Sequence, residues 1–378
     1  RLFYQRFAAP VSHIYFSTMM KPLFFAALLS GSALPLAAQT IDFEKYNPPA
    51  TLVVPGQPLQ RAKYPFIDVH NHQWNMGEAD LQQLVGVMNK LNMQVMVNLS
   101  GGNGDGLKKK TDAIRTTQPG RFIVFANIDF TGVGSASWTE KAVAQLKADV
   151  ANGANGLKIF KNLGFSVKDT DGKRVTVDDV RLDAIWQTCG QLGIPVLIHT
   201  ADPASFWEPM DNNNERLLEL KTHPNRKRAD DNPAPWQTLI DEQHRMFAKH
   251  PKTTFIAAHF GWYPNNLAKL DSILTRLPNV VVEFGAVIAE LGRQPRMAKA
   301  FFEKYQDRIL FGKDSWVPEE YATYFRVLET NDEYFPYHKK YHAFWPMYGM
   351  GLSDAVLRKV YYKNALQRGA KAAGQFFA

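Results

Sequence analysis

The stretch Phe66-Ile67-Asp68-Val69-His70-Asn71-His72 sets the fold class expected for this chain. It begins as a run rich in apolar and β-branched residues and ends in two histidines one residue apart. A doubly wound α/β sheet would carry a glycine-rich phosphate loop after its first strand, where this chain has Asp-Val-His-Asn-His. Because side chains alternate along a strand, His70 and His72 are expected to face the same way. They would lie at the strand end where a (β/α)8 barrel carries its active site.

Similar runs recur along the chain and alternate with helical patterns. The expected strands are 66–69, 94–99, 121–128, 156–160, 195–198, 253–258, 280–284 and 308–311. The expected helices are 78–91, 138–150, 180–192, 236–249, 267–277, 296–305 and 355–366. Strands that alternate with helices predict a parallel α/β sheet, and eight such strands predict a closed (β/α)8 TIM barrel.

Two connections in the expected barrel are long. One follows the fifth strand (200–235), and the other surrounds a helical piece after the eighth (314–353). Both are rich in aromatic residues, and long loops in compact domains tend to be functional, so we expect both to form walls of a substrate pocket. The glycine-rich segment 101–106 lacks the spacing of a nucleotide-binding loop and is expected to be a flexible loop at the barrel mouth.

The first 38 residues resemble an export leader. Lys21 precedes the apolar run 23–29, and small residues lead to Ala38. We expect residues 1–38 to be an upstream extension plus a signal peptide cleaved near Ala38, with the start at Met19 or Met20. Residues 39–65 would form an N-terminal arm, and residues 66–378 a single barrel domain. The mature protein is expected in the periplasm or outside the cell without a stable membrane anchor, because the apolar run is short for a bilayer span.

The charge and the cysteine content argue against several classes of function. The net charge is +8, of which three positive charges lie in residues 1–38, which hold no acid, leaving a mild +5. The basic clusters 108–110 and 226–228 are expected to be solvated faces, not a nucleic-acid site. The only cysteine, Cys189, lies among apolar residues at helical spacing, which predicts a core position. An intrachain disulfide and a cysteine-based zinc site are therefore excluded.

Polar residues at the ends of other expected strands extend the site. His199 follows the fifth strand, His259 the sixth and Asp314 the eighth. A closed barrel brings these strand ends onto one ring with the two histidines of the first strand, and imidazoles with a carboxylate suit a divalent ion such as zinc. A single histidine or aspartate at a strand end is more often structural, so the argument rests on their joint placement. The residues alone leave open whether His199 or His259 is the ligand.

This set of strand-end residues resembles the amidohydrolase superfamily. Two later motifs are similar to its amidohydrolase-related branch, which holds hydrolases and decarboxylases of small carboxylated or aromatic substrates. These motifs are Phe311-Gly312-Lys313-Asp314-Ser315 and Tyr361-Tyr362-Lys363-Asn364-Ala365. The resemblance runs from about Phe66 to Leu366. Where that branch usually has Gly-Thr-Asp or Gly-Ser-Asp, this chain has Gly312-Lys313-Asp314, which places a cation beside the site.

The resemblance implies a role for each residue. His70, His72, His199 and Asp314 would hold one divalent metal, with zinc expected first and manganese as the alternative. His259 would orient or deprotonate a water molecule, so that His259 and Asp314 are the expected catalytic residues. The cation would lower the pKa of the water and polarise a carbonyl or carboxylate.

Lys158 lies at the end of the expected fourth strand, where binuclear members of the superfamily carry a carboxylated lysine that bridges two metals. One ion is favoured over two because the similar branch is generally mononuclear, which leaves Lys158 paired with an acid or bound to a substrate carboxylate. Asp202, Glu283 and Arg293 are further candidates for substrate contact. Asp68 lies an even number of residues from His70 and His72, so its side chain is expected to face the same way and to orient one of their imidazoles.

The function expected first is metal-dependent hydrolysis of a small organic substrate by activated water. The alternative is a metal-dependent, non-oxidative decarboxylation of a small aromatic or carboxylated substrate, which needs the same ligands. A further alternative is a barrel that only binds its ligand, although the full set of polar strand ends argues against it. A small molecule is the expected partner, and assembly into a homo-oligomer is left open.

Overall fold

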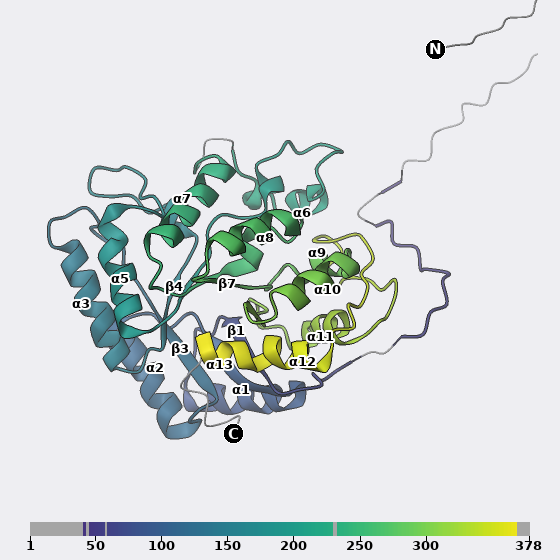
Figure 1. The fold of residues 1–378 in the computed structure, drawn as a ribbon, viewed down its shortest axis with the longest axis horizontal. Coiled ribbons are helices and arrows are strands. Elements are labelled where there is room, and N and C mark those ends of the chain that lie inside the picture. Colours follow the sequence, from purple (N-terminus) through teal and green to yellow (C-terminus); the bar gives the residue numbers. More distant parts are fainter. Residues whose placement is uncertain (1–40, 43–44, 57–58, 230–232, 369–378) are drawn as a thin grey trace, which may run out of the picture. The chain divides into compact units, whose positions relative to one another are not determined.

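The computed structural model describes residues 41–42, 45–56, 59–229 and 233–368. The chain divides into two units, Arg1–Pro48 and Pro49–Ala378. The expected signal peptide and its cleavage site near Ala38 lie outside the described residues. The strands and helices given below all belong to the second unit (Figure 1).

Eight strands form one sheet whose order follows the sequence from β1 to β8. Their bounds are β1 Phe66–Asn71, β2 Met93–Asn98, β3 Phe122–Asn127, β4 Gly156–Ile159, β5 Val196–Ile198, β6 Phe255–Ala257, β7 Val280–Glu283 and β8 Ile309–Leu310. All seven neighbouring pairs are parallel. The first strand also meets the end of the last, because Val69 N donates to Phe311 O at 2.9 Å and Asp314 N to His70 O at 2.7 Å. The predicted (β/α)8 barrel is confirmed.

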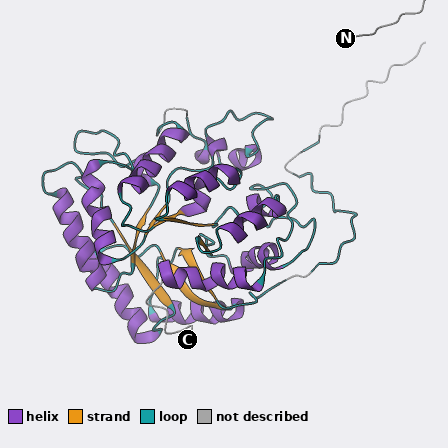
Figure 2. Cartoon of the chain, viewed as in Figure 1, coloured by secondary structure: helices purple, strands orange, loops and turns teal. Residues whose placement is uncertain are grey.

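Helices surround these strands (Figure 2). Their bounds are α1 Glu78–Leu91, α2 Gly104–Thr117, α3 Trp138–Ala151, α4 Asn162–Phe165, α5 Asp183–Leu192, α6 Leu217–Thr222, α7 Trp236–Lys249, α8 Leu267–Arg276, α9 Ile288–Gly292, α10 Pro295–Lys304, α11 Tyr321–Glu329, α12 Asp354–Arg358 and α13 Asn364–Arg368. A π-helical turn, Lys359–Lys363, joins the last two. The long connections after β5 and β8 hold α6 and α11, respectively.

The strands place alternate side chains on two sides of the sheet. Ile256 belongs to a cluster of β-branched and other apolar residues from most of the strands, which fills the barrel. Its neighbour Phe255 packs against Trp186 of α5 and Phe247 of α7, with ring centroids 6.4 and 4.8 Å apart. Cys189 is fully buried in the layer between barrel and helices. Both layers are apolar, so the polar residues at the strand ends stand out from their surroundings.

The prediction of a flexible loop over 101–106 was wrong in its second half. Helix α2 begins at Gly104, and its buried residues Leu107, Thr111 and Ile114 have helical spacing. The side chain of Asp149, on α3, accepts a hydrogen bond from Gly104 N at 2.8 Å. Burial of one helical face and a carboxylate at the helix start therefore outweigh the low helix propensity of the glycines.

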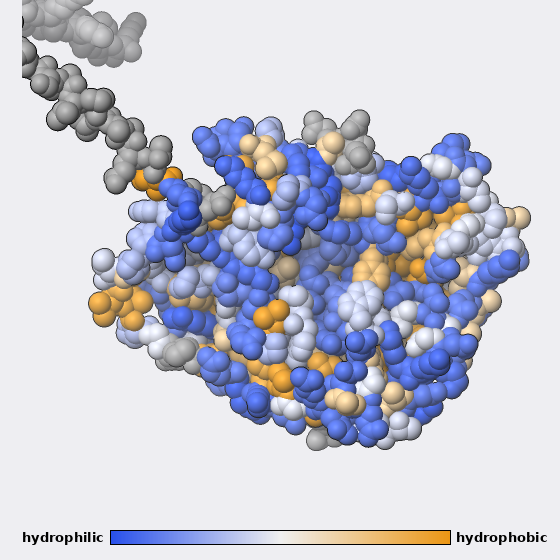
Figure 3. All heavy atoms as spheres, turned by 180° about the vertical axis from the view of Figure 1, so that it is seen from behind, coloured by the Kyte–Doolittle hydropathy of each residue, from blue (hydrophilic) through white to orange (hydrophobic). Residues whose placement is uncertain are grey.

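Polar residues cover most of the face shown in Figure 3, and apolar residues appear there as separate areas. Within the described part of the chain, no helix has both the length and the apolar character required to cross a bilayer.

Candidate metal centre and active site

Titratable side chains gather where the strands end at one rim of the barrel. They are His70 and His72 on and after β1, Lys158 on β4, His199 after β5, His259 after β6, Glu283 on β7 and Asp314 after β8. In (β/α)8 barrels this rim holds the active site.

His70 is fully buried, and its imidazole is held in one orientation. Its Nδ1 lies 2.9 Å from Glu283 Oε1, and its Nε2 lies 3.3 Å from Asp314 Oδ1. A carboxylate on Nδ1 fixes the proton there, which leaves the Nε2 lone pair directed at the rim. This Nε2 is buried without a hydrogen-bond partner. A buried nitrogen without a partner lowers the stability of the fold unless another group binds it, and a metal ion can be that group.

His72 and Asp314 complete a compact group of ligand atoms. Ser100 Oγ lies 2.9 Å from His72 Nδ1, and Asp314 Oδ1 lies 3.5 Å from His72 Nε2. The ligand atoms of His70, His72 and Asp314 all lie within 4.8 Å of one another. Three of the four expected ligands therefore converge at one point, and the residues present fit a divalent ion.

The fourth expected ligand, His199, lies next to His259 and outside this compact group. His259 Nδ1 lies 2.7 Å from the carbonyl oxygen of Gly285, which fixes its proton on Nδ1. His259 Nε2 then accepts from His199 Nδ1 at 3.3 Å. The remaining nitrogen, His199 Nε2, is buried and has no partner, as for His70. His70 and His199 thus each present an Nε2 that has no hydrogen-bond partner and can bind metal.

A left-handed turn after β6 sets the position of His259. His259, Phe260, Gly261 and Trp262 have φ angles of 57°, 56°, 57° and 62°. For the three residues with a Cβ this conformation costs about 1–2 kcal/mol each. Glu283 Oε1 accepts from His259 N at 2.8 Å and helps to hold the turn. Backbone strain of this kind is concentrated at functional sites, which supports a role for this rim.

Glu283 does not lie where the expected contact with substrate would place it. It is fully buried, and its oxygens accept from His70 Nδ1, His259 N and Gly285 N. A Cβ on Gly312 would lie 2.3 Å from Glu283 Oε2, so only glycine lets β8 pass so close to it. Glu283 therefore positions two histidines and does not line the cavity.

Burial lowers the pKa of the three expected histidine ligands. The pKa of His72 falls to about 4, and those of His70 and His199 lie well below the ordinary value. All three are neutral at physiological pH as a result. A neutral imidazole offers the lone pair that metal binding requires.

Lys158 is completely buried at the end of β4, and its Nζ has no hydrogen-bond partner. Burial lowers its pKa to about 8, while Asp314 and Glu283 act in the opposite direction. Burial also acts to raise the pKa of Asp314, but the imidazoles of His70 and its neighbours outweigh it and bring that pKa below its usual value. The rim thus combines an ionised carboxylate with an amine that has no partner of its own.

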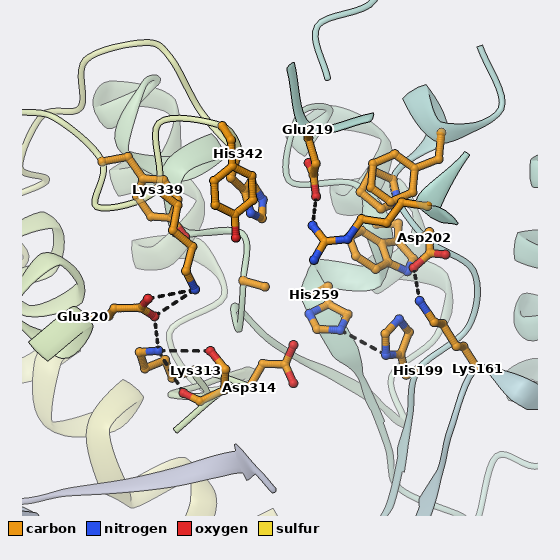
Figure 4. Close-up of a pocket in the computed structure, with 18 of the residues that line it drawn as sticks. Lys161, His199, Asp202, Glu219, His259, Lys313, Asp314, Glu320, Lys339 and His342 are labelled. Atoms are coloured by element: carbon orange, nitrogen blue, oxygen red, sulfur yellow. Dashed lines mark hydrogen bonds and ion pairs between the residues drawn. The ribbon is translucent and has the colours of Figure 1, made fainter. Parts of the chain in front are cut away.

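A cavity of about 280 Å³ opens beside His199, His259 and Asp314 (Figure 4). Both long connections contribute to its walls, as expected. Residues from the connection after β5 include Pro203, Phe206, Glu219 and Arg226, and those from the connection after β8 include Tyr324, Tyr337, Lys339, Tyr341 and His342.

Ion pairs surround this cavity. Asp202, an expected substrate contact, lines it and accepts from Lys161 at 2.6 Å and Arg228 at 2.7 Å. Glu219 likewise pairs with Arg226. The expectation that 226–228 forms a solvated face was wrong at its two arginines, because carboxylates of the pocket wall hold them.

Arg293, the third expected substrate contact, lies outside the cavity lining. It pairs with Glu215 and Glu290, and its guanidinium lies 4.1 Å from the ring centroid of Trp345. This side chain therefore contacts two carboxylates and a ring, and it links the two long connections.

Asp68 lies under the contact between β1 and β8. Its carboxylate accepts from Tyr321 Oη at 2.6 Å, Asn71 Nδ2 at 3.0 Å, and the backbone N–H groups of His70 and Lys313 at 3.1 Å each. The expected contact with an imidazole is wrong, because the register of β1 shifts between Asp68 and Asn71 and breaks the alternation. Burial raises the pKa of Asp68 to about 6.

Removal of the Tyr321 hydroxyl should destabilise the fold. Tyr321→Phe leaves a buried carboxylate without its shortest donor, and we expect the free energy of unfolding to fall by about 1.5–3 kcal/mol, the usual value for a hydrogen bond to a charged group. Chemical denaturation measures this change. Tyr334→Phe is the control, since Tyr334 is 43% exposed. Equal effects of the two substitutions would show that the Tyr321–Asp68 contact contributes nothing.

Sequence reasoning missed several residues of the site. Ser100 lies two residues after the end of β2, and the strand-end rule that selected the histidines could have selected it too. Lys339 also lines the cavity, but a lysine in a loop gives no signal of its own. Glu283 on β7 contacts His70 on β1 because of the register of strands that are distant in the sequence, so this support could not be predicted.

The parallel barrel gathers neutral imidazoles and a carboxylate at the carboxyl ends of its strands. This arrangement is that of a barrel enzyme with ligands for a divalent metal. The family model described as amidohydrolase matches residues 67–367. The chain belongs to the amidohydrolase family. It matches no curated protein.

Solved structures share the fold at low sequence identity. A dihydroxybenzoic acid decarboxylase from Polaromonas sp. JS666, with bound manganese and the inhibitor 2-nitroresorcinol, is 16% identical over 80% of this chain and 96% of its own, with a TM-score of 0.51. An uncharacterised TIM-barrel protein from Bordetella bronchiseptica is 16% identical over 82% and 99%, with a TM-score of 0.49. A 2,6-dihydroxybenzoate decarboxylase bound to 2,6-dihydroxybenzoate is 16% identical over 81% and 98%, with a TM-score of 0.47.

Proposed function

We propose that this protein is a metal-dependent hydrolase of a small organic substrate, with one divalent ion held by His70, His72, His199 and Asp314. The observation that supports this most is the pair of buried, unpartnered nitrogens, His70 Nε2 and His199 Nε2, at the rim that also holds Asp314. Zinc is proposed first, because imidazoles with one carboxylate suit it, and manganese is the alternative.

The chain's own residues supply the rest of the chemistry. When bound, a divalent ion acts as a Lewis acid that polarises a substrate oxygen and lowers the pKa of water. His259 accepts a proton at Nε2, because its Nδ1 proton is held by Gly285 O. Glu283 keeps His70 and the His259 turn in place, and the walls of the cavity exclude bulk water from the reacting atoms.

Decarboxylation is the second candidate. Lys161 and Lys339 line the cavity, and cations next to a metal centre favour a substrate that carries a carboxylate. The Polaromonas protein of similar fold is described as a decarboxylase with bound manganese. The two reactions differ in product: decarboxylation releases CO₂, whereas hydrolysis in ¹⁸O-labelled water places the label in the product.

Metal content per chain is the measurement that tests the proposal, by elemental mass spectrometry on purified protein. About one equivalent is expected. Two equivalents would promote His259 to a ligand and Lys158 to a carboxylated bridge. No metal, even after incubation with zinc or manganese, would overturn the proposal and leave a barrel that only binds its ligand.

Export remains part of the proposal, with cleavage near Ala38, an arm over residues 39–65 and the barrel from residue 66. Intact-mass measurement on protein recovered from the periplasm or the medium would test it. A product that retains residues 19–38 would contradict the proposed cleavage.

A further inference from the structure

Apart from Asp314 of the metal centre, the wall of the cavity on the β8 side carries two lysines, Lys313 and Lys339, and one carboxylate, Glu320. Glu320 Oε2 accepts from Lys313 Nζ at 2.6 Å and from Lys339 Nζ at 3.0 Å, and Glu320 Oε1 lies 2.9 Å from Lys339 Nζ. His338 lies 3.4 Å from the same carboxylate, but burial lowers its pKa to about 4, so it is neutral. One carboxylate is therefore shared between two ammonium groups.

Lys313 is the fixed member of this group. Its side chain is 1% exposed, and Ser315 O also accepts from its Nζ at 2.9 Å. The rings of Tyr321 and Tyr324 lie over the ammonium, at 5.2 and 5.9 Å from their centroids. A residue so enclosed cannot turn towards a ligand, so it acts by keeping Glu320 from neutralising Lys339.

Lys339 is the member that can reach a ligand. It lies on the connection after β8, its side chain is 27% exposed, and it points into the cavity above Glu320 and Asp314 (Figure 4). An ammonium has three donors, and Glu320 occupies two of them at most. At least one N–H of Lys339 therefore remains for a ligand.

Tyr324 and Tyr337 are two of the three tyrosines that line the same wall. Tyr324 Oη accepts from Ala286 N at 3.1 Å, which leaves its own proton for another acceptor. Tyr337 also lines the cavity. Burial raises the pKa of the Tyr324 hydroxyl, and the nearby Tyr337 raises that pKa further. An ammonium with neutral hydroxyl donors is a suitable site for a carboxylate.

The opposite wall also carries cations that are paired with carboxylates. Asp202 is shared between Lys161 and Arg228, and Figure 4 shows Lys161 and Asp202 across the cavity from Lys339 and Glu320. Among the described residues, that wall lines the cavity with Arg226, paired with Glu219, as well as Lys161, and with no tyrosine hydroxyl. The β8 side is therefore the better anion site.

We propose that Lys339, Tyr324 and Tyr337 form a subsite for a carboxylate of the substrate, separate from the group that reacts at the metal centre, and that Lys313 keeps this subsite cationic. The inference rests on the proposed function and narrows its substrate to molecules with a carboxylate away from the reacting group. Lys313 is a positioning residue, since it acts through Glu320.

The test is calorimetric binding of benzoate and of the three benzenedicarboxylates to the metal-loaded full chain. We expect at least one dicarboxylate to bind roughly ten- to a hundredfold more tightly than benzoate, the range that corresponds to a hydrogen bond to a charged group. Lys339→Gln should remove this preference. Lys340→Gln is the matched control, because it removes the same charge from the same connection but does not line the cavity.

Lys313→Thr tests the positioning role, because it removes the ammonium that shares Glu320 with Lys339. It should reduce the dicarboxylate preference while metal content stays at the wild-type level. If this variant does not fold, Lys339→Gln still decides the matter.

Three results would overturn the inference: no dicarboxylate binds more tightly than benzoate, the preference survives Lys339→Gln, or it is lost only in Lys161→Gln. Metal content measured on the same samples separates this inference from the proposed function. A chain that cannot be loaded with metal overturns the function, whereas a metal-loaded chain without the preference overturns only the subsite.

Discussion

Replacement of Asp314 by asparagine should deprive the protein of its metal and abolish its activity. Asp314 Oδ1 lies 3.3 Å from His70 Nε2 and 3.5 Å from His72 Nε2, so it is the only anionic member of the compact ligand group. An amide keeps the shape and loses the charge. We expect metal affinity to fall by more than about 100-fold, since residues that only support ligands already account for about 10- to 100-fold.

Elemental mass spectrometry after dialysis, together with a titration of metal into the stripped protein, measures this loss. Asp307→Asn provides the control, because Asp307 is an exposed aspartate paired with Lys359. An Asp314→Asn protein that retains one ion per chain with unchanged affinity would remove Asp314 from the ligand set.

Replacement of His259 by alanine should abolish activity and leave the metal in place. Its Nε2 accepts from His199 Nδ1, whereas the His199 Nε2 that would bind the metal is a separate atom, and the other three expected ligands make no hydrogen bond to its side chain. Loss of a general base typically lowers the rate by about 10²- to 10⁴-fold. Metal content and turnover are measured on the same preparation, so that loss of chemistry is separated from loss of metal.

His199→Ala is the comparison that gives this experiment its meaning. It should lose metal as well as activity, because His199 Nε2 is one of the buried nitrogens without a partner. If the His259 variant lost the metal and the His199 variant kept it, the two roles would have to be exchanged. His244→Ala, on α7 and outside the cavity lining, controls for the loss of an imidazole.

Much of the fold could be predicted because its strands are short apolar runs in a regular rhythm. Each expected strand overlaps an observed one, and helices α1 and α7 have the expected bounds. Helix α2 was missed because its first turn contains two glycines, and its stability comes from a buried face and from Asp149 on another helix.

The candidate site could be predicted only in part. A strand end marks which residues reach the rim, so the histidines and Asp314 were found together. What each of them touches depends on register and on local backbone geometry. The shift within β1 turned Asp68 away from the imidazoles, and the left-handed turn at His259 follows from no propensity of its residues. The sharing of Glu320 between Lys313 and Lys339 depends on how the connection after β8 folds back on itself, which a linear pattern does not reveal.

The closure of the barrel between β1 and β8 links metal supply to folding. Strand β8 is only two residues long, and its seam with β1 rests on few hydrogen bonds. An ion held by His70 and Asp314 would tie the first strand to the last and close the largest loop that the barrel contains, so its binding free energy would add to the free energy of unfolding. If this seam opened, β1 and β8 would become the two edges of an open sheet, and exposed edges recruit other chains. We therefore expect the yield of soluble protein to follow the concentration of divalent metal during folding.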